Sequence, residues 1–266
     1  MVPQIARRHF LALPLGLLLV PRSSVAATST RKDFTFRVDV GVLFDLLTFT
    51  VAGALVEEVD VQAGRYRVAF SGEGSGITNR TEATGIIRAG RFMPVETKST
   101  GTVRGRESRV DVRYDYERGR VEYHSVGHTL LLGRRRQVDD VLRLPIDQPL
   151  DDVLSATLNF AANKLDLDAD GSYRTAVVRR ARAENEGPDD ISASGYRAEI
   201  VPLRFRVSVD PVTGQLTALV DLTGFSSWAR SSRPARITFD ARRHLESVDS
   251  SLILGSSVKV RLAAGA

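Results

Sequence analysis

An acidic run is the sharpest chemical motif in the chain. Asp166, Asp168 and Asp170 occupy alternate positions, and Gly171 follows them directly. This spacing is typical of the first half of a calcium-binding loop, because hard carboxylate oxygens wrap the cation and glycine allows the sharp bend. The second half departs from that pattern, since Val177 stands where the bidentate glutamate would be. We therefore expect either a calcium site at the three aspartates or a solvated turn, and no other cofactor.

Two further patterns fall short of a catalytic or metal site. His124 and His128 are four residues apart, a spacing that suits zinc on a helix, but they stand in a segment with strand alternation. On a strand the two side chains would be roughly 13 Å apart, too far to share one metal ion. Residues 72–76 have the composition of a nucleophile elbow without its Gly-x-Ser-x-Gly spacing. We therefore assign no catalytic residue.

Period-2 alternation of apolar and charged residues recurs along the chain. It is clearest in residues 65–70, 109–116 and 203–209. Such segments suit antiparallel strands that cover a core on one side, whereas a parallel sheet buried on both faces would show continuous apolar runs. Frequent glycines and the turn sequence at 210–214 predict successive hairpins. The predicted fold class is mostly β, a curved antiparallel sheet or open β-barrel with one short helix.

One segment has helical rather than strand periodicity. Its apolar residues are Leu150, Val153, Leu154 and Leu158. Asp151 or Asp152 near its start would complement the helix dipole. We expect an amphipathic helix over residues 151 to about 165 that lies on the sheet or plugs it.

Two polar stretches are interpreted as solvated. Residues 181–194 are charged and rich in turn formers, which predicts a long solvated loop. The basic run 134–136 is followed at once by Asp139 and Asp140, which favours a solvated turn over an anion-binding patch.

The first 27 residues have the organisation of an export signal. Arg7 and Arg8 precede an apolar run over residues 10–20, and small residues follow at 24–27. The run is roughly half the ~20 residues needed to span a bilayer, so we expect a cleaved signal peptide over 1–27 and no transmembrane anchor after cleavage. The arginine pair fits a twin-arginine signal as well as an ordinary secretory one. A single β-rich domain over 28–266, located in the periplasm, is the expected mature protein.

Composition narrows the possible partners and cofactors. The chain has 37 basic and 32 acidic residues, and loss of Arg7, Arg8 and Arg22 with the leader leaves nearly balanced charge. There is no cysteine, which excludes disulfides and thiolate metal sites. A nucleic-acid partner is excluded by the expected compartment and by the lack of a long basic patch.

Short motifs resemble a known bacterial family. They are Gly90-Arg91-Phe92-Met93-Pro94 and the segments 110–115, 149–156 and 233–237. Together they resemble the bacterial domain-of-unknown-function family numbered 3108, over about residues 34–262. The resemblance implies an exported protein with a curved antiparallel sheet or open barrel and one short helix. It brings no assigned activity and no catalytic residue.

Two classes of function remain open at this point. The first is a non-enzymatic envelope protein that binds an apolar or amphiphilic ligand, or another envelope protein, in the concavity of the sheet. A tyrosine in an apolar wall is informative, because its hydroxyl needs a partner that a polar-headed ligand could supply. The expected ligand-binding residues are Tyr66, Phe70, Tyr114, Tyr116, Leu154, Leu158 and Phe205.

The second class is a hydrolase of envelope polymer that uses paired carboxylates. The candidate pairs are Asp139 with Asp140 and Asp151 with Asp152. Adjacent acids point to opposite sides of a strand or diverge on a helix, so neither pair makes an acid/base couple by itself. Binding is therefore the preferred function, and the hydrolase is the alternative.

Overall fold

A computed structural model describes most of the chain downstream of the expected leader. The described residues are 29–42, 47–103, 105–129, 132–145, 148–182, 186–187, 189–191, 195–223, 229, 232–252 and 256–264. The expected signal peptide lies outside them. Within them, no helix is long and apolar enough to cross a membrane.

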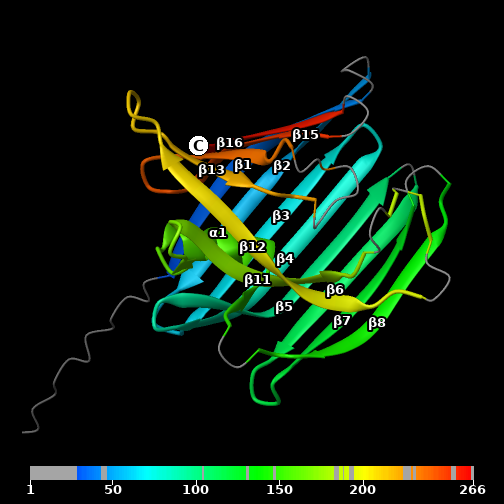
Figure 1. Ribbon diagram of the computed structural model, residues 1–266, viewed down its shortest axis with the longest axis horizontal. Coiled ribbons are helices and arrows are strands. Elements are labelled where there is room, and N and C mark those ends of the chain that lie inside the picture. Colours follow the sequence, from blue (N-terminus) through cyan, green and yellow to red (C-terminus); the bar gives the residue numbers. More distant parts are fainter. Residues whose placement is uncertain are drawn as a thin grey trace, which may run out of the picture.

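Eight long strands form a meander in the first half of the described chain (Figure 1). They are β1 (Ser29–Val42), β2 (Leu47–Asp60), β3 (Arg65–Gly74), β4 (Ile77–Arg88), β5 (Arg91–Val103), β6 (Arg106–Asp115), β7 (Arg120–His128) and β8 (Arg135–Arg143). The only helix of the described residues and the shorter strands follow. They are β9 (Leu150–Asp151), α1 (Val153–Ala161), β10 (Asp166–Leu167), β11 (Ser172–Arg180), β12 (Ala198–Val209), β13 (Leu216–Val220), β14 (Ala235–Phe239), β15 (Leu245–Ser251) and β16 (Ser257–Ala264).

All the strands belong to one curved sheet that does not close. Its order runs from β10 through β16, continues with β1, and ends at β8; β9 pairs in parallel with β11, and the other ladders are antiparallel. The edge strand β8 comes close to β12, where the Asp140 carboxylate accepts a hydrogen bond from the Ala198 amide at 3.0 Å. The predicted fold class is confirmed: the protein is a mostly β, open barrel-like sheet, and the described residues contain one short helix.

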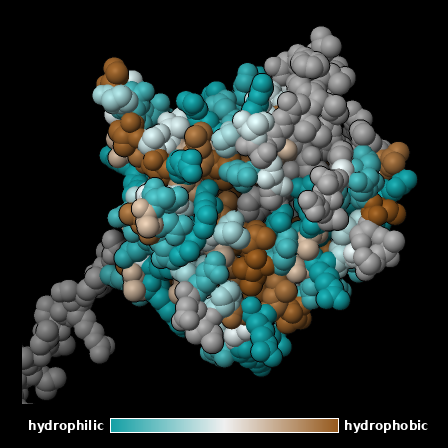
Figure 2. Space-filling model, in the orientation of Figure 1, coloured by the Kyte–Doolittle hydropathy of each residue, from teal (hydrophilic) through white to brown (hydrophobic). Residues whose placement is uncertain are grey.

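The alternating segments form strands as predicted. Residues 65–70 begin β3, where Tyr66 and Val68 are buried, and 203–209 form the second half of β12. The turn at 210–214 is also confirmed, because the Asp210 carboxylate accepts from the backbone at 212 and 213, and Gly214 adopts a positive φ of 70°. In Figure 2 the visible face is mostly hydrophilic, with hydrophobic patches in its lower middle.

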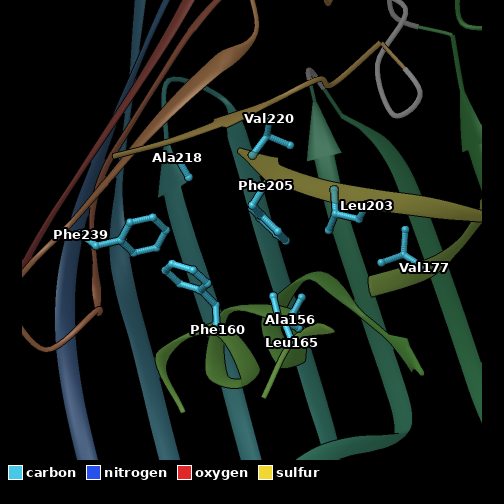
Figure 3. Packing of buried hydrophobic residues seen from close by; sticks show 9 residues of the cluster. All are labelled: Ala156, Phe160, Leu165, Val177, Leu203, Phe205, Ala218, Val220 and Phe239. Atoms are coloured by element: carbon cyan, nitrogen blue, oxygen red, sulfur yellow. The ribbon is translucent and has the colours of Figure 1, made fainter. Parts of the chain in front are cut away.

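Packed side chains fill much of the concave side. One cluster joins α1 to β11–β14 and centres on Phe160, which contacts the rings of Phe205 and Phe239 (Figure 3). A second cluster joins β6, β7 and β8 to β9, β11 and β12, with Tyr114 and Tyr123 among its buried residues. Strands β8 and β12 are therefore joined by side-chain packing, without a ladder of backbone hydrogen bonds between them.

The helix is shorter than predicted at both ends. Asp151 belongs to β9, and Asp152 is the N-cap, accepting from the backbone amides of Leu154 at 2.8 Å and Ser155 at 3.1 Å. At the other end, Asn163 takes a positive φ of 57°, which stops the helix after Ala161. The predicted range of 151 to about 165 is therefore wrong in its bounds, although the acidic start is confirmed.

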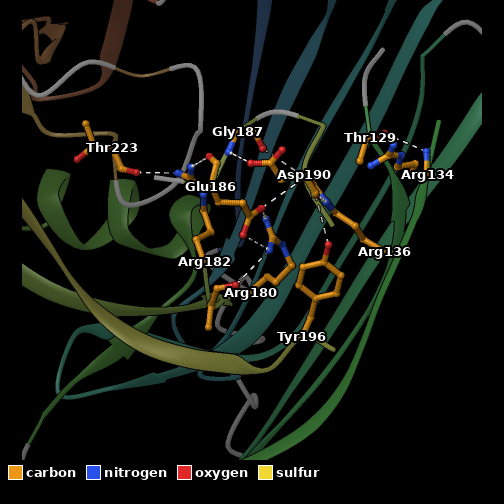
Figure 4. Close-up of polar contacts among 11 residues, drawn as sticks. Thr129, Arg134, Arg136, Arg180, Arg182, Glu186, Gly187, Asp190, Tyr196 and Thr223 are labelled. Carbon is orange, nitrogen blue, oxygen red and sulfur yellow. Dashed lines mark hydrogen bonds and ion pairs between the residues drawn. The ribbon is translucent and has the colours of Figure 1, made fainter. Parts of the chain in front are cut away.

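The polar stretch 181–194 is not simply a solvated loop. The Glu186 side chain is only 6% exposed, and it pairs with Arg180 at 2.6 Å and with Arg136 at 3.4 Å (Figure 4). Arg136 also donates to the backbone oxygens of Gly187 and Asp190. The interpretation of 134–136 as a solvated turn is thus wrong for Arg136, because strand β8 carries that side chain to the buried carboxylate.

Replacement of Glu186 by glutamine should destabilise the fold strongly. It leaves two poorly solvated guanidinium groups without their carboxylate, at a cost of about 3 kcal/mol. Glu58 is the matched control, since it also pairs with two arginines, Arg31 and Arg67, but is 33% exposed. Glu58→Gln should cost less than about 1 kcal/mol. Denaturant titrations of both variants test this, and equal losses would contradict the assignment.

Candidate functional site

A groove lies between α1 and the inner face of the sheet. Its inner part has a volume of about 220 Å³ and its outer part about 250 Å³. The two parts share Glu57, Leu158, Ala161 and His244. Each part is somewhat smaller than the ~300–1,000 Å³ of a typical small-molecule site, and the shared residues make the two parts neighbours.

The inner part of the groove is apolar because of the strand alternation. Phe34 and Val38 of β1 line it with Leu55 of β2 and Phe70 of β3. Phe34 and Leu55 are cross-strand partners, and Val38 is paired with Val260 of β16. Leucines of α1 form the opposite wall.

The outer part of the groove is a polar mouth. The cross-strand pair Lys32 and Glu57 lies two residues beyond Phe34 and Leu55, on the same face of the sheet. Lys32 Nζ lies 2.8 Å from His244 Nε2, and Arg242 also lines this part. Burial raises the pKa of the Glu57 carboxyl, and the nearby Lys32 ammonium opposes that shift only in part.

A buried carboxylate fixes α1 above the groove. Asp151 is fully buried, and its Oδ2 accepts from Arg91 at 2.7 Å and from Thr175 at 2.6 Å. Its Oδ1 accepts from the Asn159 amide at 3.0 Å. Asn159 in turn donates to the Phe92 carbonyl and accepts from the Phe92 amide, both at 2.8 Å. These contacts tie the helix to β5 and β11.

A second contact holds the start of the helix. The Tyr66 hydroxyl lies 2.6 Å from Ser155 Oγ, and the Ser155 hydroxyl also donates to the Asp152 carboxylate. Burial raises the pKa of both the Tyr66 hydroxyl and the Asp152 carboxyl. Tyr66 is therefore a buried hydrogen-bonding residue that supports the helix.

The predicted ligand-binding residues separate into two groups. Phe70, Leu154 and Leu158 line the groove. Tyr66 packs against Leu158 at the edge of the same region. Ligand binding by these residues stays a prediction, and the structure brings them together.

The remaining predicted ligand-binding residues lie elsewhere. Tyr114 and Phe205 belong to the two packed clusters. Tyr116 lies beside a separate hollow with Arg91, and its hydroxyl donates to the Pro94 carbonyl at 2.9 Å. A ligand in the groove would not need these three side chains.

Sequence reasoning missed the residues of the mouth. Lys32, Glu57 and His244 come from strands and a loop that no predicted motif covered. A signal was available in β2. Val51, Leu55 and Val59 lie on one face of this strand, and Glu57 lies on the same face between Leu55 and Val59. A carboxylate on an otherwise apolar row needs a partner or a function.

The paired carboxylates of the hydrolase alternative are engaged in the fold. Asp151 and Asp152 are buried with the partners described above. Asp139 is exposed beside His124, and Asp140 accepts from the backbone of Val141 and Ala198. Each acid has its own local partners, so neither pair forms a shared acid/base centre.

The residues of the predicted metal sites also have protein partners. Asp168 lies 3.4 Å from Arg174 and 3.5 Å from Arg204, and Asp170 accepts from the backbone and hydroxyl of Ser172. Asp166 pairs with Arg174 in the β10–β11 ladder. The described part of the chain contains no group of three or more His, Cys, Asp or Glu residues suited to a metal ion. Calcium binding stays a prediction.

The two histidines lie on β7, as the strand alternation predicts. His124 contacts Asp139, and His128 Nδ1 lies 3.0 Å from the Glu107 carbonyl oxygen. Each imidazole therefore has its own partner on a neighbouring strand.

The site and the fold together define a β-rich domain whose helix covers a groove in an open, barrel-like sheet. No family model matches the chain, and no curated protein matches it. Among solved structures, it is similar to a β-barrel-like protein of the domain of unknown function DUF1849 from Brucella abortus. The identity is 10% and the TM-score 0.39, with 88% of this chain and 98% of that chain covered.

The pH dependence of stability tests the buried carboxylate. Burial raises the pKa of Asp151 from 3.8 to about 6, against the opposing effects of Arg91 and Thr175. A raised folded-state pKa stabilises the fold below pH 3.8, and this contribution is lost as the pH rises through 6. Relative to Asp151→Asn, the wild-type free energy of unfolding should fall by about 2 kcal/mol from pH 4 to pH 7.

Unfolding curves of the two proteins at several pH values measure this difference. Asp249→Asn is the control, because Asp249 pairs with Arg261 on the surface. That variant should follow the wild-type pH dependence. A constant difference between wild type and Asp151→Asn would rule out the raised pKa.

Calcium binding is tested by thermal melting with calcium and with a chelator. Calcium at ten times its dissociation constant should raise the free energy of unfolding by about 1.4 kcal/mol, and Asp168→Ala should remove that increase. Identical melting in both conditions would leave the loop as a turn only.

Proposed function

We propose that this protein is an exported, periplasmic binding protein that holds an apolar or amphiphilic ligand in the groove beneath α1. The observation that carries the proposal is the groove itself, which has apolar walls and a polar mouth. An amphiphile needs both environments, since its chain gains from burial and its headgroup must stay hydrated or paired.

The contrast between the groove and the packed clusters supports a ligand-binding site rather than a packing defect. In the two packed clusters, large side chains such as Phe160 and Tyr114 fill the space between facing elements. In the groove, Leu154 and Thr157 are only half-buried although they face the sheet. Apolar surface left accessible in a concave site is typical of ligand pockets.

The anchoring of α1 also supports the proposal. The contacts of Asp151, Ser155 and Asn159 fix the helix through its buried polar side. The apolar side of the helix is thereby held at a set distance from β1, β2 and β3. A preformed wall binds with a smaller entropic cost than one that must be ordered by the ligand.

The export part of the proposal rests on the sequence. The leader-like segment 1–27 fits a periplasmic protein. The short motifs around Gly90 and Pro149 support a relation to the family numbered 3108, which we include in this proposal.

Filling the groove should weaken ligand binding. Leu154→Trp adds bulk to the half-buried helical wall, and it should weaken the binding of a fluorescent amphiphile such as dansylaminoundecanoic acid by at least about tenfold. Val141→Trp is the matched control, because Val141 is an exposed residue on β8. Fluorescence titration measures both affinities, and denaturant unfolding verifies that both variants fold.

Two results would contradict the proposed function. One is a wild-type protein that does not bind the probe. The other is a folded Leu154→Trp variant that binds as well as the Val141→Trp control, which would place any binding outside the groove.

A further inference from the structure

The charges at the mouth of the groove are unequal in sign. Lys32 and Arg242 line the outer part with a single acid, Glu57, and the guanidinium of Arg243 borders the inner part. Counted over the described residues of the two parts together, three Lys or Arg side chains accompany one carboxylate. Arg243 already stacks on the Phe160 ring at 4.2 Å, so Lys32 and Arg242 are the cations best placed to meet a headgroup.

A chain of contacts orients the Lys32 ammonium. An ammonium group can only donate, so His244 Nε2 is the acceptor in their 2.8 Å contact. The proton of that imidazole then lies on Nδ1, which is 3.2 Å from the Asp240 carboxylate. Asp240 also accepts from the backbone amides of Arg242 and His244, which holds the loop between β14 and β15 in place. One N–H of the ammonium is used in this way, and two others are left for Glu57, water or a ligand.

Glu57 is the carboxyl that an anion would meet at the mouth. Its carboxyl is half-buried, and burial raises its pKa. A protonated carboxyl can donate a hydrogen bond to an anionic oxygen, whereas an ionised one would compete with the anion for Lys32. A cationic headgroup would instead meet Lys32 and Arg242 with only Glu57 to attract it.

We infer that the ligand is a single-chain amphiphile with an anionic headgroup, whose chain lies beneath α1 and whose headgroup binds Lys32 at the mouth. The inference rests on the proposed function and adds the charge and the orientation of the ligand. Charge complementarity at the mouth selects the headgroup, and the apolar inner part takes the chain.

Ligands with the same chain and different headgroups test this orientation. Dissociation constants are measured by calorimetry for dodecanoate, dodecyl phosphate, dodecyltrimethylammonium and dodecanol, each below its aggregation limit. The anions should bind at least about tenfold more tightly than the cation, since a hydrogen bond to a charged group contributes that much. The comparison of the two anions distinguishes a carboxylate from a phosphate ligand.

Charge-neutralising variants locate the headgroup. Lys32→Gln should remove the preference for anions and leave dodecanol binding unchanged. Lys259→Gln is the matched control, because Lys259 is exposed on the outer face of β16, and it should behave as wild type. Glu57→Gln should keep or increase the affinity for anions.

The outcomes separate this inference from the proposed function. Equal binding of all four ligands, or an anion preference that survives Lys32→Gln, would overturn the inference and leave the groove as a binding site. If the cation bound more tightly than the anions, and Glu57→Gln removed that preference, the headgroup of the ligand would be cationic rather than anionic. Failure of every ligand to bind would overturn both the inference and the proposed function.

Discussion

The buried carboxylate of Asp151 is the interaction on which the rest of the interior depends. A charge inside a protein is tolerated only with close partners, and Asp151 takes them from β5, α1 and β11. Arg91 of β5 is 60 residues from Asp151 in the sequence, so one side chain fixes the positions of α1 and β11 relative to a distant strand. The groove has a defined width because its helical wall is attached to the sheet at this point.

The fold could be predicted from the sequence because its strands bury one face only. In segments such as 65–70 and 203–209, apolar and charged residues alternate. This pattern is local, so it can be recognised from the sequence without knowledge of the tertiary structure. The helix could be found for the same reason. Its ends could not, because they depend on the side chain of Asp152 and on the backbone conformation of Asn163.

The site was only partly predictable, since its mouth depends on strand order. Lys32 and His244 meet because β1 lies beside β16 and β16 beside β15. No local pattern contains that information. The burial of Glu186 was equally hidden from sequence analysis. Its neighbours in the sequence are polar and indicate a solvated loop, but its partner Arg136 comes from the distant strand β8. Leu154 and Leu158 were accessible to prediction because helical spacing alone places them on one side.

The pairing of β1 with β16 has a consequence for how the chain reaches this structure. One long edge of β1 stays without a strand neighbour until β16, the last described strand, has been synthesised. Pairings this distant in sequence form slowly, and an open edge can meanwhile recruit a strand from another molecule. Arg37 and Asp39 of β1 carry charge on the outer face of that edge, which discourages such mispairing. Correct assembly of this sheet therefore requires that β16 pair with β1 before a strand of another molecule does.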